Sequence, residues 1–283
     1  MAKFQYSKAI SDSFKLIFSN LYVLVPQLLV SLIGFISIPF YLRMFDFGEN
    51  FDISSMGSFV PSIILVAISS IILTNVSYGW TLALIGKIVK KGKADLFKEF
   101  KSGLRKGLVY FLTTLIALSV FFVGALVFMV LFIIIEMVSS FIPILGVLLT
   151  ILSVIAVIAA IVAFILAFMY LTSVIALENF GAVKSVKLSY IHFKSNKSHS
   201  LALLLIIILF SIIVSLICLV VFYAILFIFA GSVSDEAILA YMIENPVKYS
   251  FVSFFSNLPN IAVVVWSFAF VTIAYVRKKK TKK

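Results

Sequence analysis

The chain alternates between long apolar runs and short segments rich in charge. Six runs contain no Asp, Glu, Lys or Arg, and they cover residues 21–42, 59–86, 108–135, 144–177, 201–230 and 251–276. A helix needs about 20 apolar residues to cross the hydrocarbon core of a bilayer, and one charged side chain at its centre costs about 2.5–3.5 kcal/mol. The pattern therefore predicts an all-α membrane protein, with six transmembrane helices in one domain that covers residues 1–283.

The stretch 108–177 is long enough for two long spans or three short ones. The segments on either side of it, 87–107 and 178–200, are both strongly basic. Because basic loops stay on the cytoplasmic side, the chain must cross the membrane an even number of times between them. We therefore predict two spans, with the turn at residues 136–143, where a charge, two serines and a proline interrupt the run.

The distribution of basic residues predicts the orientation. Of the 23 Lys and Arg residues, 21 lie in segments 1–20, 87–107, 178–200 and 277–283, and only Arg43 and Lys248 lie elsewhere. This places both termini in the cytoplasm and predicts a multi-pass protein of the cell membrane. The first apolar run is longer than the core of a signal peptide and lacks a small-residue cleavage site, so we expect it to remain as the first span.

Three basic segments also carry apolar residues at helical spacing. These apolar residues are Ile10, Phe14, Ile17 and Phe18 in the first segment, Leu96, Phe97, Phe100 and Leu104 in the second, and Val183, Val186, Tyr190 and Phe193 in the third. The spacing predicts amphipathic helices in the membrane interface on the cytoplasmic side, at residues 4–19, 94–106 and 182–196. A helical hairpin follows each one, and this threefold plan reflects either internal duplication or the coincidence of a shared interface composition.

Composition and charge then narrow the function. Apolar residues make up 63% of the chain and charged residues 12%, against about half and about a quarter in soluble proteins, which excludes a soluble fold. The net charge of +12 lies beside the spans, so we expect anionic lipid headgroups, and not nucleic acid, as its partner. The predicted lipid contacts are Lys98, Lys101, Arg105, Lys184 and Lys187. Solvated faces without lipid preference are the alternative interpretation.

Candidate chemistry is sparse. No metalloprotease helix, nucleophile elbow or phosphate loop occurs. The two histidines, His192 and His199, have no Cys or carboxylate at ligand spacing, so we predict no metal site, no cofactor and no enzymatic activity. Cys218, the single cysteine, lies inside an apolar run and is expected to be a buried apolar side chain.

Uncharged polar residues interrupt two of the apolar runs. They are Ser69, Ser70, Thr74, Asn75, Ser77 and Tyr78 in the second run, and Asn257 and Asn260 around Pro259 in the sixth. Such residues either line a neutral path through the membrane or hydrogen-bond between helices and to backbone groups freed by proline. The spans contain no ionisable acid or base for proton-coupled transport.

The segment 178–196 carries a resemblance. Glu178, Gly181, Ser185, Val186, Lys187, Ser189 and Asn196 fit the inner-loop motif of the glycerophosphodiester phosphodiesterase membrane-domain family, whereas Leu188 replaces a usual base and His192 a usual leucine. The chain resembles that family over about 20 residues and in its six-span plan. The resemblance implies a membrane module that occurs fused to a soluble phosphodiesterase or alone, and the catalytic residues of that enzyme have no counterpart here.

Three functions are compatible with these patterns. The leading hypothesis is a non-enzymatic membrane module that binds lipids or a protein partner, because basic amphipathic segments lie on one side and the spans lack charge. The alternative is a carrier or permease component for a lipid or another apolar substrate, with its energy supplied by a neighbouring subunit. An intramembrane enzyme is the third, and it would need polar groups that converge in a wet cavity.

Overall fold

The computed structural model describes residues 4–44, 53–230, 234, 241 and 244–280, and it contains no β-strand within these ranges. The helices follow one another in the order α1 (Tyr6–Phe18), the 3₁₀ turn η1 (Leu21–Leu24), α2 (Val25–Met44), α3 (Ile53–Lys91), α4 (Phe100–Phe141), α5 (Pro143–Phe168), α6 (Leu171–Leu177), α7 (Ala182–Lys194), α8 (Lys197–Ala230) and α10 (Pro246–Lys280). The all-α fold class predicted from the sequence is confirmed.

The apolar runs coincide with long helices. Among the described residues, five helical segments are long and apolar enough to cross a membrane, namely α3, α4, α5 with α6, α8 and α10. A sixth is present if α1 and the start of α2 count as one broken span, which bends by 88°. The break lies at Ser19 and Asn20: the backbone of Asn20 leaves the helical conformation, and its Nδ2 donates to the carbonyl oxygen of Leu16 at 2.8 Å. Pro26, which lacks an N–H, then fits the first turn of α2.

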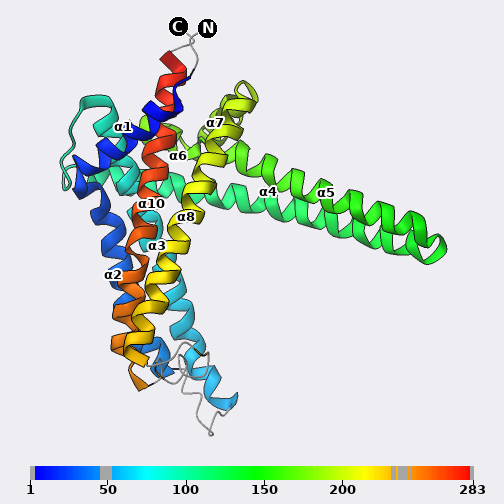
Figure 1. The fold of residues 1–283 in the computed structure, drawn as a ribbon, viewed down its shortest axis with the longest axis horizontal. Helices are drawn as coiled ribbons and strands as arrows, with labels where there is room; N and C mark the ends of the chain where they lie inside the picture. The colour runs from blue at the N-terminus through cyan, green and yellow to red at the C-terminus, as the bar shows by residue number, and fades with distance from the viewer. Residues whose placement is uncertain (1–3, 45–52, 231–233, 235–240, 242–243, 281–283) are drawn as a thin grey trace.

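Four long helices form a bundle, and α10 lies at its centre. Helices α2, α3, α8 and α10 run side by side, and both ends of the chain lie at the same end of the bundle (Figure 1). Trp266, Phe270, Val265 and Ala269 of α10 are fully buried or nearly so, in a core shared with α1, α3, α6 and α8. This core lies in the half of the bundle near the termini.

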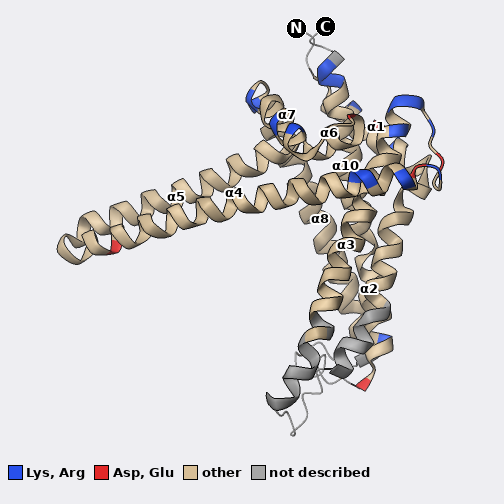
Figure 2. Ribbon diagram, turned by 180° about the vertical axis from the view of Figure 1, so that it is seen from behind, with Lys and Arg blue, Asp and Glu red and all other residues tan. Residues whose placement is uncertain are grey.

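Helices α4 and α5 form a hairpin that projects crosswise from the bundle (Figures 1 and 2). Its turn is at Ile142, inside the predicted turn 136–143, and α5 begins at Pro143. Most side chains of the hairpin are exposed and apolar. The sequence predicts two spans here, and the structure adds that they do not run alongside the other four.

The predicted interfacial segments have different structures. Helices α1 and α7 occupy most of 4–19 and 182–196, and each packs one face on the protein: Ala9, Ser13, Leu16 and Ile17 of α1 are buried. In segment 94–106, by contrast, α4 begins at Phe100 and continues unbroken into the hairpin. No separate helix forms there, because the apolar residues after Gly107 extend the same helix.

Candidate functional site

The basic residues gather at the end of the bundle where the termini lie (Figure 2). This region, called the basic end below, consists of α1, residues 87–106, residues 178–197 and residues 277–279. Several of its charges are already paired: Lys87 lies 2.9 Å from Glu99, and Arg277 forms an ion pair with Asp12. The charges that remain unpaired are the candidates for ligand binding.

A cavity of about 340 Å³ opens at the basic end between the start of α4 and the loop that joins α6 to α7. The residues that line this basic cavity are Lys101, Ser102, Arg105, Lys106 and Val109 of α4, Ile175 of α6, and Glu178, Asn179 and Phe180 of the loop. Lys101 and Arg105 are exposed and lie one helical turn apart, so they share a face of α4. The cavity therefore combines three bases with one acid.

Two lysines hold the wall of the basic cavity in place. Lys90 of α3 donates to the carbonyl oxygen of Leu177, and Lys106 donates to that of Ala176. Both acceptors belong to the last turn of α6. The carbonyl groups of that turn have no hydrogen-bond partners within the helix, and they form the negative end of its dipole. Both bonds tie the end of α6, where the loop begins, to α3 and α4. The ammonium group of Lys106 therefore helps to hold α6 against α4. Lys101 and Arg105, in contrast, make no ion pair within the described residues.

The structure brings together three of the five predicted lipid contacts. Lys101 and Arg105 line the cavity, and Lys184 stacks over the ring of Phe180 at 3.9 Å from its centroid. Lys98 lies elsewhere, 3.7 Å from Asp95, beside a second cavity whose further bases are Lys87, Lys91 and Lys93. Lys187 is exposed and lines neither cavity.

Sequence reasoning missed several residues of the basic cavity, among them Lys106, Asn179 and Phe180. Lys106 was part of the charge pattern, but only its position against α6 shows that it faces the cavity. Asn179 and Phe180 follow the end of α6 and gave no signal of their own. Their contribution depends on how the loop folds against α4, which no local pattern reveals.

The histidines serve packing at the basic end. His199 is buried, and its Nδ1 lies 2.9 Å from the hydroxyl of Tyr6. The His192 ring lies between Tyr170 and Tyr275, with centroid distances of 4.4 and 4.6 Å. In the part of the chain that the structure describes, no three His, Cys, Asp or Glu side chains gather as metal ligands. Cys218 is buried, as its apolar surroundings predict.

The residues that carry the family resemblance form a joint between helices. Glu178 pairs with Lys279 at 3.2 Å, and Gly181 precedes the first residue of α7. Ser189 donates to the carbonyl of Ala167 at 2.7 Å, which fastens α7 to α5. These contacts suit a structural role.

Comparison of the chain with protein-family models, with curated proteins and with solved structures found no match. The resemblance to the membrane-domain family therefore stays a prediction. The class that the structure itself defines is a helical, multi-pass membrane protein.

Proposed function

We propose that this protein is a non-enzymatic membrane module that binds anionic lipid headgroups in the basic cavity, on the cytoplasmic side of the cell membrane. The observation that supports it is the position of exposed bases beside exposed apolar side chains on one helix. Lys101 and Arg105 line the cavity, and Leu104 and Leu108 of the same helix are 42% and 59% exposed. A phosphate that carries acyl chains can contact both the bases and the apolar side chains, whereas free phosphate can contact only the bases.

The chemistry of the cavity suits a lipid phosphate. Arg105 offers a planar fork that matches phosphate oxygens, and Lys101 adds a mobile charge. Ser102 of α4 and Asn179 of the loop line the same cavity and supply neutral donors. The acid in the lining, Glu178, is already neutralised by Lys279 and does not repel an anion.

Lipid counting by native mass spectrometry tests the proposal. The purified chain, taken from nanodiscs of phosphatidylcholine and phosphatidylglycerol at low salt, should retain phosphatidylglycerol. Neutralising both bases as Lys101→Gln with Arg105→Gln should weaken retention about fivefold per residue, since each base near an anionic surface contributes about 1 kcal/mol. High salt should weaken the parent in the same way.

A matched control separates the cavity from general surface charge. Lys91→Gln with Lys93→Gln removes two bases of the same end that do not line the basic cavity. That variant should retain lipid like the parent. Equal loss in both double variants would show that the basic end attracts lipid only through its net charge, and it would refute a defined site.

The second candidate function is a carrier component for a lipid or another apolar substrate. It is favoured by a cavity with an uncharged polar lining between α2, α3 and α10. Transfer of a fluorescent lipid between leaflets of proteoliposomes, with and without a co-purifying ATPase, tests it. If the protein binds lipid but transfers none, with or without the ATPase, the non-enzymatic lipid-binding module is the only supported function.

A further inference from the structure

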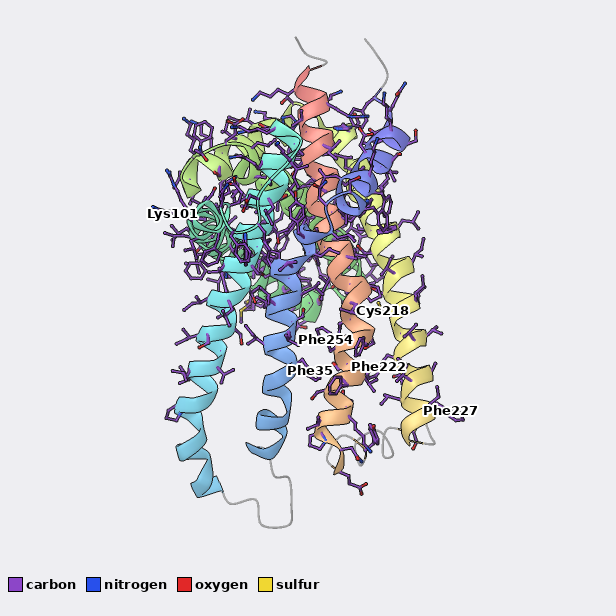
Figure 3. All side chains as sticks on the ribbon, turned by 90° about the vertical axis from the view of Figure 1, so that its left-hand side faces the viewer. Phe35, Lys101, Cys218, Phe222, Phe227 and Phe254 are labelled. Atoms are coloured by element: carbon purple, nitrogen blue, oxygen red, sulfur yellow. The ribbon has the colours of Figure 1, made fainter. Side chains whose placement is uncertain are left out.

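A cavity of about 450 Å³ lies between α2, α3 and α10 of the bundle, away from the basic end. Its lining comes from three helices and contains no charged residue: Gln27, Val30, Ser31, Gly34 and Phe35 of α2, Thr74 and Tyr78 of α3, and Ser253, Phe254, Asn257, Asn260, Ile261 and Val264 of α10. In Figure 3, Phe35 and Phe254 lie close together between α2 and α10. We call this space the neutral cavity.

The polar groups of the neutral cavity are only partly paired with one another. Gln27 donates its Nε2 to the Thr81 hydroxyl at 3.3 Å, and Asn260 donates its Nδ2 to the Asn257 Oδ1 at 3.3 Å. No hydrogen bond within the described residues is made by the Gln27 Oε1, the Asn260 Oδ1 or the Tyr78 hydroxyl. The cavity thus offers both acceptors and a donor to an occupant.

Two other polar residues of α3 show that this pattern is selective. Asn75 donates to the carbonyl of Ile71 at 2.7 Å, and Ser77 donates to that of Thr74 at 3.0 Å. Both bonds satisfy the side chains within their own helix. Neither residue lines the neutral cavity. The polar residues of α3 thus include some that hydrogen-bond within their own helix and others, Thr74 and Tyr78, that line the cavity.

The depth of the cavity makes its open polar groups costly. It lies within the predicted spans, where lipid cannot hydrogen-bond, so a polar group without a partner there is unfavourable. An occupant with its own donors and acceptors removes that cost. Because no formal charge lines the cavity, an ionised headgroup would meet no counter-charge there, and an uncharged one fits better.

One part of the cavity is apolar and aromatic. The Phe35 ring lies 5.6 Å from the ring of Phe254, and it also contacts Phe251 at 4.7 Å, edge to face. Polar groups and aromatic rings in one space suit a molecule with a small polar head and a hydrocarbon tail. Gly34 and Asn257 are exposed at the rim, which offers the tail a way out between the helices.

We propose that the neutral cavity binds an uncharged lipid whose head carries hydroxyl and carbonyl groups, of which diacylglycerol is the simplest membrane example. The head lies against Gln27, Tyr78 and Asn260, and the acyl chain passes Phe35 and Phe254. The inference does not depend on the proposed function, since the two cavities share no residue.

Photo-crosslinking tests the proposal. The full chain in phosphatidylcholine nanodiscs is irradiated with a photoactivatable diacylglycerol, and the labelled peptides are mapped by mass spectrometry. We expect labels on α2 and α10 around Phe35 and Phe254. Tyr78→Phe with Asn260→Leu should lower this labelling at least tenfold, and unlabelled diacylglycerol should compete with the probe where phosphatidic acid does not.

Three controls decide what a loss of labelling means. Tyr223→Phe removes the hydroxyl of an exposed tyrosine in α8 that lies outside the cavity, and it should label like the parent. The Lys101→Gln with Arg105→Gln variant should also label like the parent, which separates this site from the basic cavity. Tyr78→Phe alone keeps the ring contacts with Tyr110 and Phe268, so it tests the hydroxyl without loss of packing.

Two results would overturn the proposal. Unchanged labelling in Tyr78→Phe with Asn260→Leu would show that the polar groups do not select the lipid. Absence of competable labelling in the parent would show that the cavity holds only water.

Discussion

At the residue scale, three glycines decide how α3 and α4 cross. A Cβ on Gly79 would lie 2.1 Å from the backbone nitrogen of Gly107, and one on Gly107 would lie 2.6 Å from the carbonyl oxygen of Asn75. Gly103 is equally close to Trp80. Gly103 and Gly107 are four residues apart, the spacing that lets membrane helices touch backbone to backbone. That spacing was visible in the sequence, but the helix it contacts was not.

We predict that Gly107→Leu disrupts this crossing. The added side chain meets backbone, which cannot move aside, so we expect a loss of at least about 1–3 kcal/mol of stability. The melting temperature of the purified protein in detergent measures it. Gly124→Leu is the matched control on the same helix, because nothing lies within 4 Å of a Cβ there. A similar melting temperature for both variants would contradict the close crossing.

At the element scale, the α4–α5 hairpin is the feature that the sequence pattern does not explain. A helix that lies flat in the interface needs one polar face, yet residues 108–135 and 144–168 contain no charged residue on any face. At about 1.5 Å per residue each is long enough to cross the hydrocarbon core. We therefore expect the hairpin to cross the bilayer, and to tilt toward the bundle axis when lipid surrounds it.

Cysteine labelling tests the position of the hairpin. In a Cys218→Ser background, a cysteine at Glu136 should react with an impermeant reagent from outside intact cells, as should cysteines at Glu49 and Asp235, which lie outside the described residues. Cysteines at Asp95, Lys187 and Lys280 should react only in opened membranes. A cysteine at Glu136 that behaves like one at Asp95 would mean that the hairpin lies along the cytoplasmic surface.

At the scale of the whole molecule, the basic residues define one end of the protein. Segments that are far apart in the chain, among them α1, the start of α4, α7 and the end of α10, meet at this end (Figure 2). The net charge of the chain is thus concentrated where both termini lie. This arrangement supports the proposed orientation, with that end in the cytoplasm, because translocating so many bases would be unfavourable.

We predict that the purified chain hydrolyses no glycerophosphodiester, despite the family that its inner loop resembles. Such hydrolysis needs a metal ion or a paired acid and base to activate water. At the basic end, Glu178 and Asp12 are paired with Lys279 and Arg277, and His199 is bonded to Tyr6. Release of glycerol phosphate or alcohol, followed with and without divalent metal, measures the activity.

A specific outcome would contradict this negative prediction. Turnover that depends on metal, is lost in His192→Ala or Glu178→Ala, and persists in Lys282→Ala would make the protein an enzyme. Turnover that persists in all three variants would instead indicate a contaminating hydrolase.

The sequence alone determined the long apolar helices and the class of protein, because the cost of burying charge in lipid acts on each apolar run separately. It also determined which segments are basic. Only the tertiary structure decided that Lys101 and Arg105 share a cavity with Phe180 while Lys98 and Lys187 do not, and that Tyr78 and Asn260 face one space while Asn75 bonds to its own helix. Those outcomes depend on helix crossings and rotations, which are set by contacts between residues far apart in the chain. A hydropathy pattern shows that a residue is in a span, but not which neighbour it meets.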